Sequence, residues 1–140
     1  MMARIKIDMP EKRLTIIKLP VRITEINYGN HLGNDALVGI LHESRVQWLK
    51  SHNFSELDIM GIGLIMSDLA VVYKNESFYG DELSIHIYSG EITAVSFELF
   101  YVLYNQDNKV IAQAKTGMVC FNYELKKVVA IPAELLSIIE

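Results

Sequence analysis

The residues best placed for chemistry lie in a short loop and in the helix that we expect to follow it. Residues 27–34 (NYGNHLGN) are rich in Gly and Asn, a composition typical of a loop. Asn34 or Asp35 is a natural N-cap for the helix. The first turn of a helix presents unpaired N–H groups and the positive end of the helix dipole. Such donors stabilise a carbonyl that becomes an oxyanion by ~3 kcal/mol each, but turns, caps and a hydrogen-bonded His31 are the ordinary roles of these residues.

Glu43 is the second candidate, eight residues and about two helical turns past Asp35. A carboxylate on a mostly apolar helix is costly to bury in its charged form, a setting that suits a general base or a nucleophile. The alternative is a residue that faces solvent or pairs with Arg45, Arg22 or Lys50. Taken alone, Glu43 fits this structural role better.

Several familiar catalytic signatures are missing from the sequence. It contains no phosphate-binding glycine loop, no G-x-S-x-G elbow, no H-E-x-x-H helix and no paired Cys-x-x-Cys. Cys120 is the only cysteine, so no internal disulfide can form and no Cys-based zinc site is indicated.

Composition places the chain among ordinary single-domain proteins. Its 140 residues, 51% of them hydrophobic, are enough for one core over residues 1–140. A net charge of −4 disfavours non-specific binding of nucleic acid. No stretch approaches the roughly 18 apolar residues of a spanning helix, and residues 1–10 make a poor signal peptide. We expect a cytoplasmic protein that binds neither nucleic acid nor membranes.

The spacing of apolar residues predicts one long helix among several strands. The helix should run from Asp35 to about Lys50, because its apolar residues recur at helical spacing. Residues 51–66 should be irregular, with Gly61 and Gly63 as breakers. We expect strands at 14–26, 67–77, 83–88, 93–104 and 109–121, and a short C-terminal helix from Ala133.

These elements predict an α+β fold with an antiparallel sheet. One amphipathic helix cannot cover a sheet of this size from both sides, so the sheet must curl around the helix. The other face or an edge of the sheet must then be solvated or paired with a second subunit. Residues 93–104 are apolar on one face and partly apolar on the other, which favours dimerisation.

The candidate loop also resembles a known family. Residues 24–34 (TEINYGNHLGN) resemble the acidic-x-Asp-x-x-x-His-x-Asn-Asn signature of the 4-hydroxybenzoyl-CoA thioesterase-like hotdog proteins. Glu43-Ser44-Arg45 is similar to the family's Glu-Ala-Arg, and residues 79–83 (YGDEL) to its Tyr-Gly-Asp-x-Leu. The likeness extends over roughly residues 14–132 in the expected order and spacing.

This resemblance implies a hotdog fold, in which a curved antiparallel sheet wraps one central helix. It also implies a homodimer or homotetramer with sites at subunit interfaces. There the helix N-terminus would polarise the thioester carbonyl of an acyl-CoA or acyl carrier protein substrate, and a carboxylate would activate water or attack the carbonyl. The implied activity is that of a thioester hydrolase, which would need no metal or organic cofactor.

The sequence departs from the family at two positions of the signature. The usual catalytic Asp is here Asn27, which cannot act as a base, and the first Asn of His-x-Asn-Asn is here Gly33. Some hotdog subfamilies carry their catalytic Glu on the central helix, where Glu43 lies. We therefore expect Glu43 to be the base or nucleophile. The expected supporting residues are the N–H of Asn34 or Asp35 as oxyanion donor, Asn27 and His31 as orienting groups, Asp35 as the other carboxylate, and Tyr28, Met66 and Ser67 as substrate contacts.

Two other functions remain open at this stage. A non-catalytic hotdog protein that binds acyl thioesters would explain the loss of the carboxylate at Asn27. A hydratase or dehydratase is less well supported, because the Asp/His helix motif expected of hotdog hydratases is missing. Fold alone does not decide between these functions.

Overall fold

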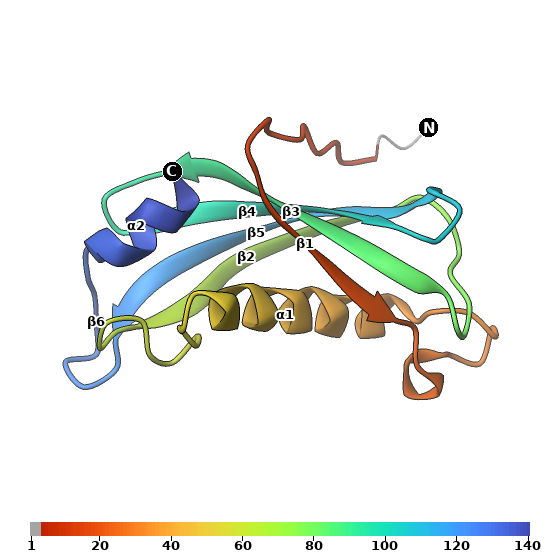
Figure 1. Cartoon of the computed structure of the whole chain (residues 1–140), viewed down its shortest axis with the longest axis horizontal. Coiled ribbons are helices and arrows are strands. Elements are labelled where there is room, and N and C mark those ends of the chain that lie inside the picture. The colour runs from red at the N-terminus through yellow and green to blue at the C-terminus, as the bar shows by residue number, and fades with distance from the viewer. Residues whose placement is uncertain (1–3) are drawn as a thin grey trace.

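A curved antiparallel sheet forms the body of the protein, and a long helix lies along its concave side (Figure 1). The computed structural model describes residues 4–140. The expectation about a signal peptide was made for residues 1–10, and the first three of these lie outside the described residues. The elements in chain order are β1 (Arg13–Pro20), a 3-10 turn (Ile23–Glu25), α1 (Asn34–Ser51), β2 (Gly63–Tyr73), β3 (Glu82–Ile92), β4 (Ser96–Tyr104), β5 (Val110–Asn122), β6 (Lys127–Val128) and α2 (Ala133–Ile139).

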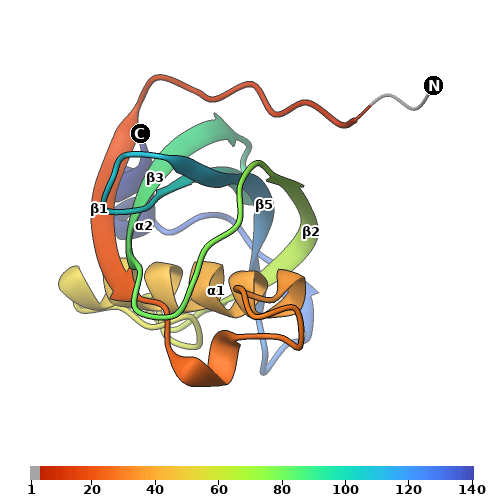
Figure 2. The same ribbon diagram turned by 90° about the vertical axis from the view of Figure 1, so that its right-hand side faces the viewer.

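The strand order in the sheet is β1-β3-β4-β5-β2, and β6 adds a short pairing to β5. Figure 2 shows the sheet arching over α1, with β1 on one side of the arch and β2 on the other. The two strands farthest apart in this order, β1 and β2, therefore form the two edges. The architecture is the one expected from the sequence.

Strand alternation and helix periodicity meet in one core between α1 and the sheet. On β3 the buried side chains are Leu83, Ile85 and Ile87, at a spacing of two. The helix contributes Leu37, Leu41 and Trp48, all almost fully buried. Each such side chain stabilises the fold by roughly 1.5–3 kcal/mol. The sheet can curl because this narrow apolar stripe of α1 fills its concave face.

The strand expected over residues 14–26 ends earlier, at Pro20. Proline has no N–H to donate to a ladder. Val21 N still donates to Asp81 O at 2.8 Å, and the strand ends there. The chain then turns through the 3-10 segment, where Arg22 N donates to Glu25 Oε1 at 2.7 Å. This turn brings residues 26–33 back to the start of α1.

The boundaries of β2 were also predicted wrongly. The strand begins at Gly63, inside the stretch expected to be irregular, and ends at Tyr73. Gly63 pairs with Phe121 in the ladder, and the ring of Tyr123 packs where a side chain on Gly63 would lie, so glycine fits this position. No helix within residues 4–140 is long and apolar enough to cross a membrane.

Candidate functional site

The start of α1 carries free backbone donors, as the sequence predicted, but its cap is different. Gly33, not Asn34 or Asp35, is the N-cap residue, and no side chain caps the helix. The first helical bond runs from Leu37 N to Gly33 O at 3.1 Å. Within residues 4–140, the N–H groups of Asn34, Asp35 and Ala36 have no hydrogen-bond acceptor. A glycine cap leaves these donors uncovered, whereas a side chain at position 33 would lie over them.

Two loops lie side by side at this end of the helix (Figure 1), residues 21–33 and residues 74–81. Leu32 N donates to Ser77 O at 2.7 Å and Gly80 N donates to Val21 O at 3.0 Å, which joins the loops. Between them and the helix start lies a cavity of about 210 Å³, called here the N-terminal pocket. It is lined by His31, Leu32, Asn34, Leu37, Tyr73, Lys74, Asn75, Glu76, Ser77 and Ile111.

Tyr73, the last residue of β2, closes one side of this pocket. Its hydroxyl donates to Asn34 O at 2.8 Å and so ties the sheet to the first turn of the helix. Burial, and then the negative charge of Asp35, raise the pKa of Tyr73, so its hydroxyl stays a donor at neutral pH. The pocket thus has a rigid wall next to the free N–H groups.

The Tyr-Gly-Asp segment has a structural role that explains its residues. Gly80 has a φ of +85°, which favours glycine. Asp81 Oδ2 accepts from Ser77 Oγ and from Phe78 N, both at 2.9 Å. Burial acts to raise the pKa of Asp81, but its hydrogen bonds from Phe78 N, Gln106 and Ser77 outweigh that effect and hold the pKa below its ordinary value. Asp81 therefore anchors the loop that carries Glu76.

Asn27 is held by its own loop. Its side-chain Oδ1 accepts from Gly29 N at 2.9 Å, which fixes the orientation of the amide. A Cβ on Gly29 would lie 3.2 Å from both Asn27 Oδ1 and His31 Nε2, so the bare glycine lets these two side chains approach. The structure therefore places Asn27 and His31 together, and the Asn27 NH₂ group can donate to a ligand here.

His31 meets a residue that the sequence did not suggest. Its Nδ1 lies 3.2 Å from Leu32 O, and its Nε2 lies 3.8 Å from Glu76 Oε1. Glu76 sits in the loop after β2, far from His31 in sequence, in a charged stretch without a motif. Only the close approach of the two loops reveals the pair.

Glu43 lies elsewhere, on the exposed face of α1. It accepts a hydrogen bond from Gln47 Nε2 at 3.0 Å and is not buried in the protomer. It lines a groove of about 700 Å³ between α1 and the end of β1, which Asp35 and Gly39 also line. Eight residues of helix separate Glu43 from the Asp35 N–H by about 12 Å along the axis, so one protomer cannot bring both to the same carbonyl.

The expected substrate contacts are not part of the N-terminal pocket. Tyr28 is fully exposed at the tip of its loop. Met66 and Ser67 lie on the edge strand β2, at an irregularity in its pairing with β5. Asp35, in contrast, stays close to the helix start, since its Oδ1 is 2.9 Å from where a Cβ on Gly33 would lie. The structure therefore gathers Asn27, His31, Asn34 and Asp35, and separates the other four.

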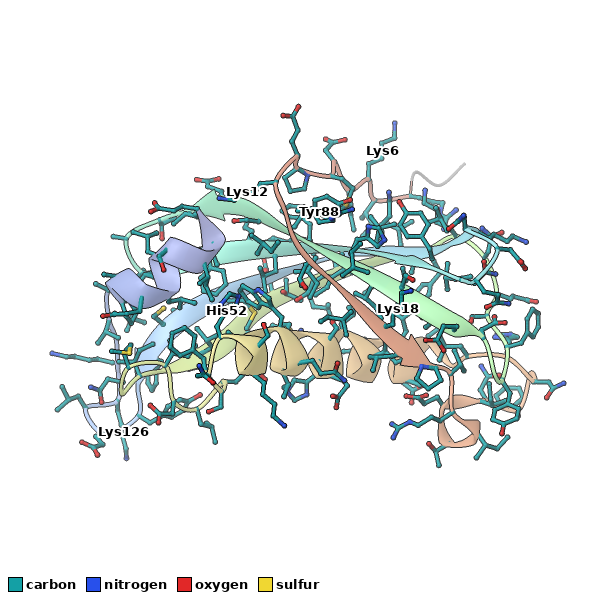
Figure 3. The ribbon with its side chains drawn as sticks, viewed as in Figure 1. Lys6, Lys12, Lys18, His52, Tyr88 and Lys126 are labelled. Atoms are coloured by element: carbon teal, nitrogen blue, oxygen red, sulfur yellow. The ribbon has the colours of Figure 1, made fainter. Side chains whose placement is uncertain are left out.

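Two further polar residues of α1 belong to the fold. Arg45, almost buried, donates to Glu56 at 3.2 Å and to the Tyr101 hydroxyl at 3.3 Å, so the Arg of Glu-Ser-Arg pins the helix to the sheet. His52 is the C-cap residue and lies at the end of α1 opposite the N-terminal pocket (Figure 3). Neither residue reaches the site.

The fold, together with a match to a family model, identifies the class of protein. Residues 21–139 match the model of the Thioesterase-like superfamily, and the chain belongs to this family. The hotdog fold and the resemblance to thioesterases of this type are thereby confirmed.

Three particular relatives illustrate the match. A protein from Aquifex aeolicus named provisionally as an esterase is 28% identical over 100 residues, which are 70% of this chain and 76% of that protein. A 1,4-dihydroxy-2-naphthoyl-CoA thioesterase from Synechocystis has a TM-score of 0.81 and 18% identity, over 89% of this chain and 93% of that one. A Staphylococcus aureus protein solved in complex with CoA has a TM-score of 0.80 and 17% identity, over 95% and 85% of the two chains. The two structures share the fold with this chain.

Proposed function

We propose that the protein hydrolyses an acyl thioester carried by CoA or by acyl carrier protein. One observation supports this most directly. The free N–H groups of Asn34, Asp35 and Ala36 open at the start of α1, where Asn34 borders the N-terminal pocket and Asp35 and Ala36 border the groove along α1, so a carbonyl oxygen bound at the helix start can accept from them. Membership of the Thioesterase-like superfamily and the thioesterase from Synechocystis support the same reaction class.

The carbonyl oxygen of the thioester binds at the first turn of α1 in this mechanism. As a nucleophile attacks the acyl carbon, negative charge moves onto that oxygen, and the N–H groups with the helix dipole stabilise it. The electron pair of the C–S bond then leaves on sulfur. Asn27 contributes its NH₂ group to orientation, in line with its occupied Oδ1.

Glu43 takes part as base or nucleophile only from a second protomer. Around a two-fold axis, contacts between the two helices are reciprocal. If residue i of one protomer faces residue j of its partner, residue j of the first faces residue i of the partner, and the axis passes midway between positions i and j. Glu43 faces the Asp35 N–H if the two helices cross near position 39. That position is Gly39, where a Cβ would meet nothing within 4 Å, so two α1 helices can approach closely there.

The test is a hydrolysis panel of short, long and aromatic acyl-CoAs, with acyl carrier protein thioesters in parallel. We expect wild type to release thiol from at least one class, and Glu43→Gln to lose about 10²-fold or more in kcat, the usual scale for removing such a carboxylate. Lys50→Gln, on the same exposed face, is the matched control and should keep its rate. Acyl-CoA binding without turnover of any thioester would instead establish a non-catalytic binder.

A further inference from the structure

The mouth of the N-terminal pocket holds a pair of side chains that the proposed function does not yet use. His31 Nε2 and Glu76 Oε1 are 3.8 Å apart, longer than a direct hydrogen bond of about 2.7–3.2 Å. Both line the pocket that borders Asn34. The side chain of Glu76 is 66% exposed and that of His31 29%, so both are open to a ligand.

The other ring nitrogen indicates which tautomer His31 adopts. Nδ1 lies 3.2 Å from Leu32 O, and a carbonyl oxygen can only accept. Nδ1 therefore carries a proton, and in the neutral ring Nε2 is a bare acceptor facing the Glu76 carboxylate. Lys74 lines the same pocket and adds a positive charge beside the pair.

Two acceptors at this separation suit a single water molecule that donates one proton to each. A water takes about 30 Å³, so the pocket of about 210 Å³ keeps room for an acyl carbonyl. With both protons engaged, the lone pairs of the water point away from His31 and Glu76. The rest of the pocket, which Asn34 borders, leaves space beside this pair for the acyl group.

We propose that His31 and Glu76 hold and deprotonate the water that completes hydrolysis. This inference rests on the proposed function, in which Glu43 is either the base or the nucleophile. A base inside the pocket leaves Glu43 of the other protomer the role of nucleophile. His31 is then a catalytic residue that takes the proton, and Glu76 is a positioning residue that orients the water and stabilises the charged ring.

The reaction then has two steps, acyl transfer to Glu43 and hydrolysis of the acyl-enzyme. In the first, the Glu43 carboxylate forms a C–O bond to the acyl carbon, the C–S bond breaks, and its electron pair leaves on sulfur. In the second, the water gives a proton to His31 Nε2 and its oxygen bonds to the acyl carbon. The C–O bond to Glu43 then breaks and restores the carboxylate, and His31 passes its proton to the thiolate or to solvent. The products are a carboxylic acid and a thiol.

Glu76→Gln tests this assignment, because it removes the charge and keeps the size of an exposed side chain. We expect kcat to fall by roughly 10–100-fold, with one rapid equivalent of thiol released before the slow steady state, since acyl transfer to Glu43 is intact. His31→Gln should behave in the same way, and Glu76→Asp should retain part of the rate. Glu82→Gln, an equal charge change outside the pocket, should match wild type.

Unchanged turnover in Glu76→Gln and His31→Gln would overturn the proposal, and so would a slow rate without the initial thiol release. A separate measurement needs no activity: ¹⁵N NMR of the His31 ring should show Nδ1 protonated and Nε2 unprotonated. The opposite tautomer would overturn the proposal even in an active enzyme. A wild type that cleaves no thioester would refute the proposed function. Because the tautomer measurement needs no activity, it tests the role of His31 separately from the proposed function.

Discussion

At the scale of single residues, the site depends on two glycines and on an asparagine whose side chain is held by a backbone hydrogen bond. Gly33 caps α1 without covering its donors, and Gly29 lets Asn27 and His31 approach. Asn27, at the position of the family's catalytic Asp, has its oxygen bound to Gly29 N. Acid–base chemistry must therefore come from other residues, and the titratable side chains around the helix start are those of His31, Asp35, Tyr73, Lys74 and Glu76.

Asp81 gives a prediction about pH and stability. Its folded pKa is lowered from the ordinary 3.8, so its contribution is fully present above that value and is lost as pH falls through the folded pKa. Asp81→Asn should destabilise the protein by about 1.5–3 kcal/mol at pH 7, the scale of hydrogen bonds to a charged group. The difference should shrink below about pH 4, as followed by urea unfolding. Asp107→Asn, an exposed carboxylate in another turn, should show no such loss.

At the scale of elements, α1 has two faces with separate tasks. One face packs Leu37, Leu41 and Trp48 against the sheet. The opposite face is exposed and carries Glu43 with the open position Gly39. A glycine inside a helix destabilises it by roughly 0.5–1 kcal/mol relative to alanine, so its presence on this face needs another reason. Close approach of a second α1 supplies one.

Substitutions at Gly39 test that reason. Gly39→Ala should raise the stability of the protomer by up to about 1 kcal/mol, because it removes the conformational freedom of glycine. Gly39→Leu should also fold, since nothing in the protomer lies within 4 Å of a Cβ there. It should lower thioester turnover at least tenfold, because a bulky side chain holds two helices apart. If Gly39→Leu is as active as Lys50→Leu on the same face, the crossing at position 39 is wrong.

At the scale of the whole molecule, one edge of the sheet is suited to pairing with another chain. The edge strand β2 pairs only with β5 within residues 4–140, and it exposes Ile65, Met66 and Leu69. An unpaired strand edge with apolar side chains is a ready site for pairing with another chain. A second copy is the natural partner, because the same edge on both protomers can form a continuous sheet around a two-fold axis.

Sedimentation velocity at micromolar concentration should therefore find a homodimer or homotetramer. Met66→Lys should shift the protein toward monomer, because a charge on an edge strand opposes pairing. Ile16→Lys, on the opposite edge strand β1 and similarly exposed, is the control and should leave the assembly unchanged. A monomeric wild type would remove the basis for a site shared between protomers.

The sequence by itself determined the order of the elements and the fold class. Apolar spacing in the α1 segment and alternation in β3 to β5 are local patterns, so the helix, the long strands and the antiparallel curl could be predicted from them. The loop at Asn27–Asn34 could also be located, because its glycines and asparagines are local turn signals.

Only the tertiary structure decided where the chemistry-bearing groups meet. The contact of Val21 with Asp81 after β1 and that of Gly63 with Tyr123 at the start of β2 join segments that are distant in the chain. The pair of His31 and Glu76 exists because loops 21–33 and 74–81 are joined by hydrogen bonds. Glu43 lies about two turns from its own helix start, on the face of α1 that the sheet leaves exposed. The sequence gives the distance between two residues along a helix axis. Only packing against the sheet decides which face of the helix stays exposed for a partner.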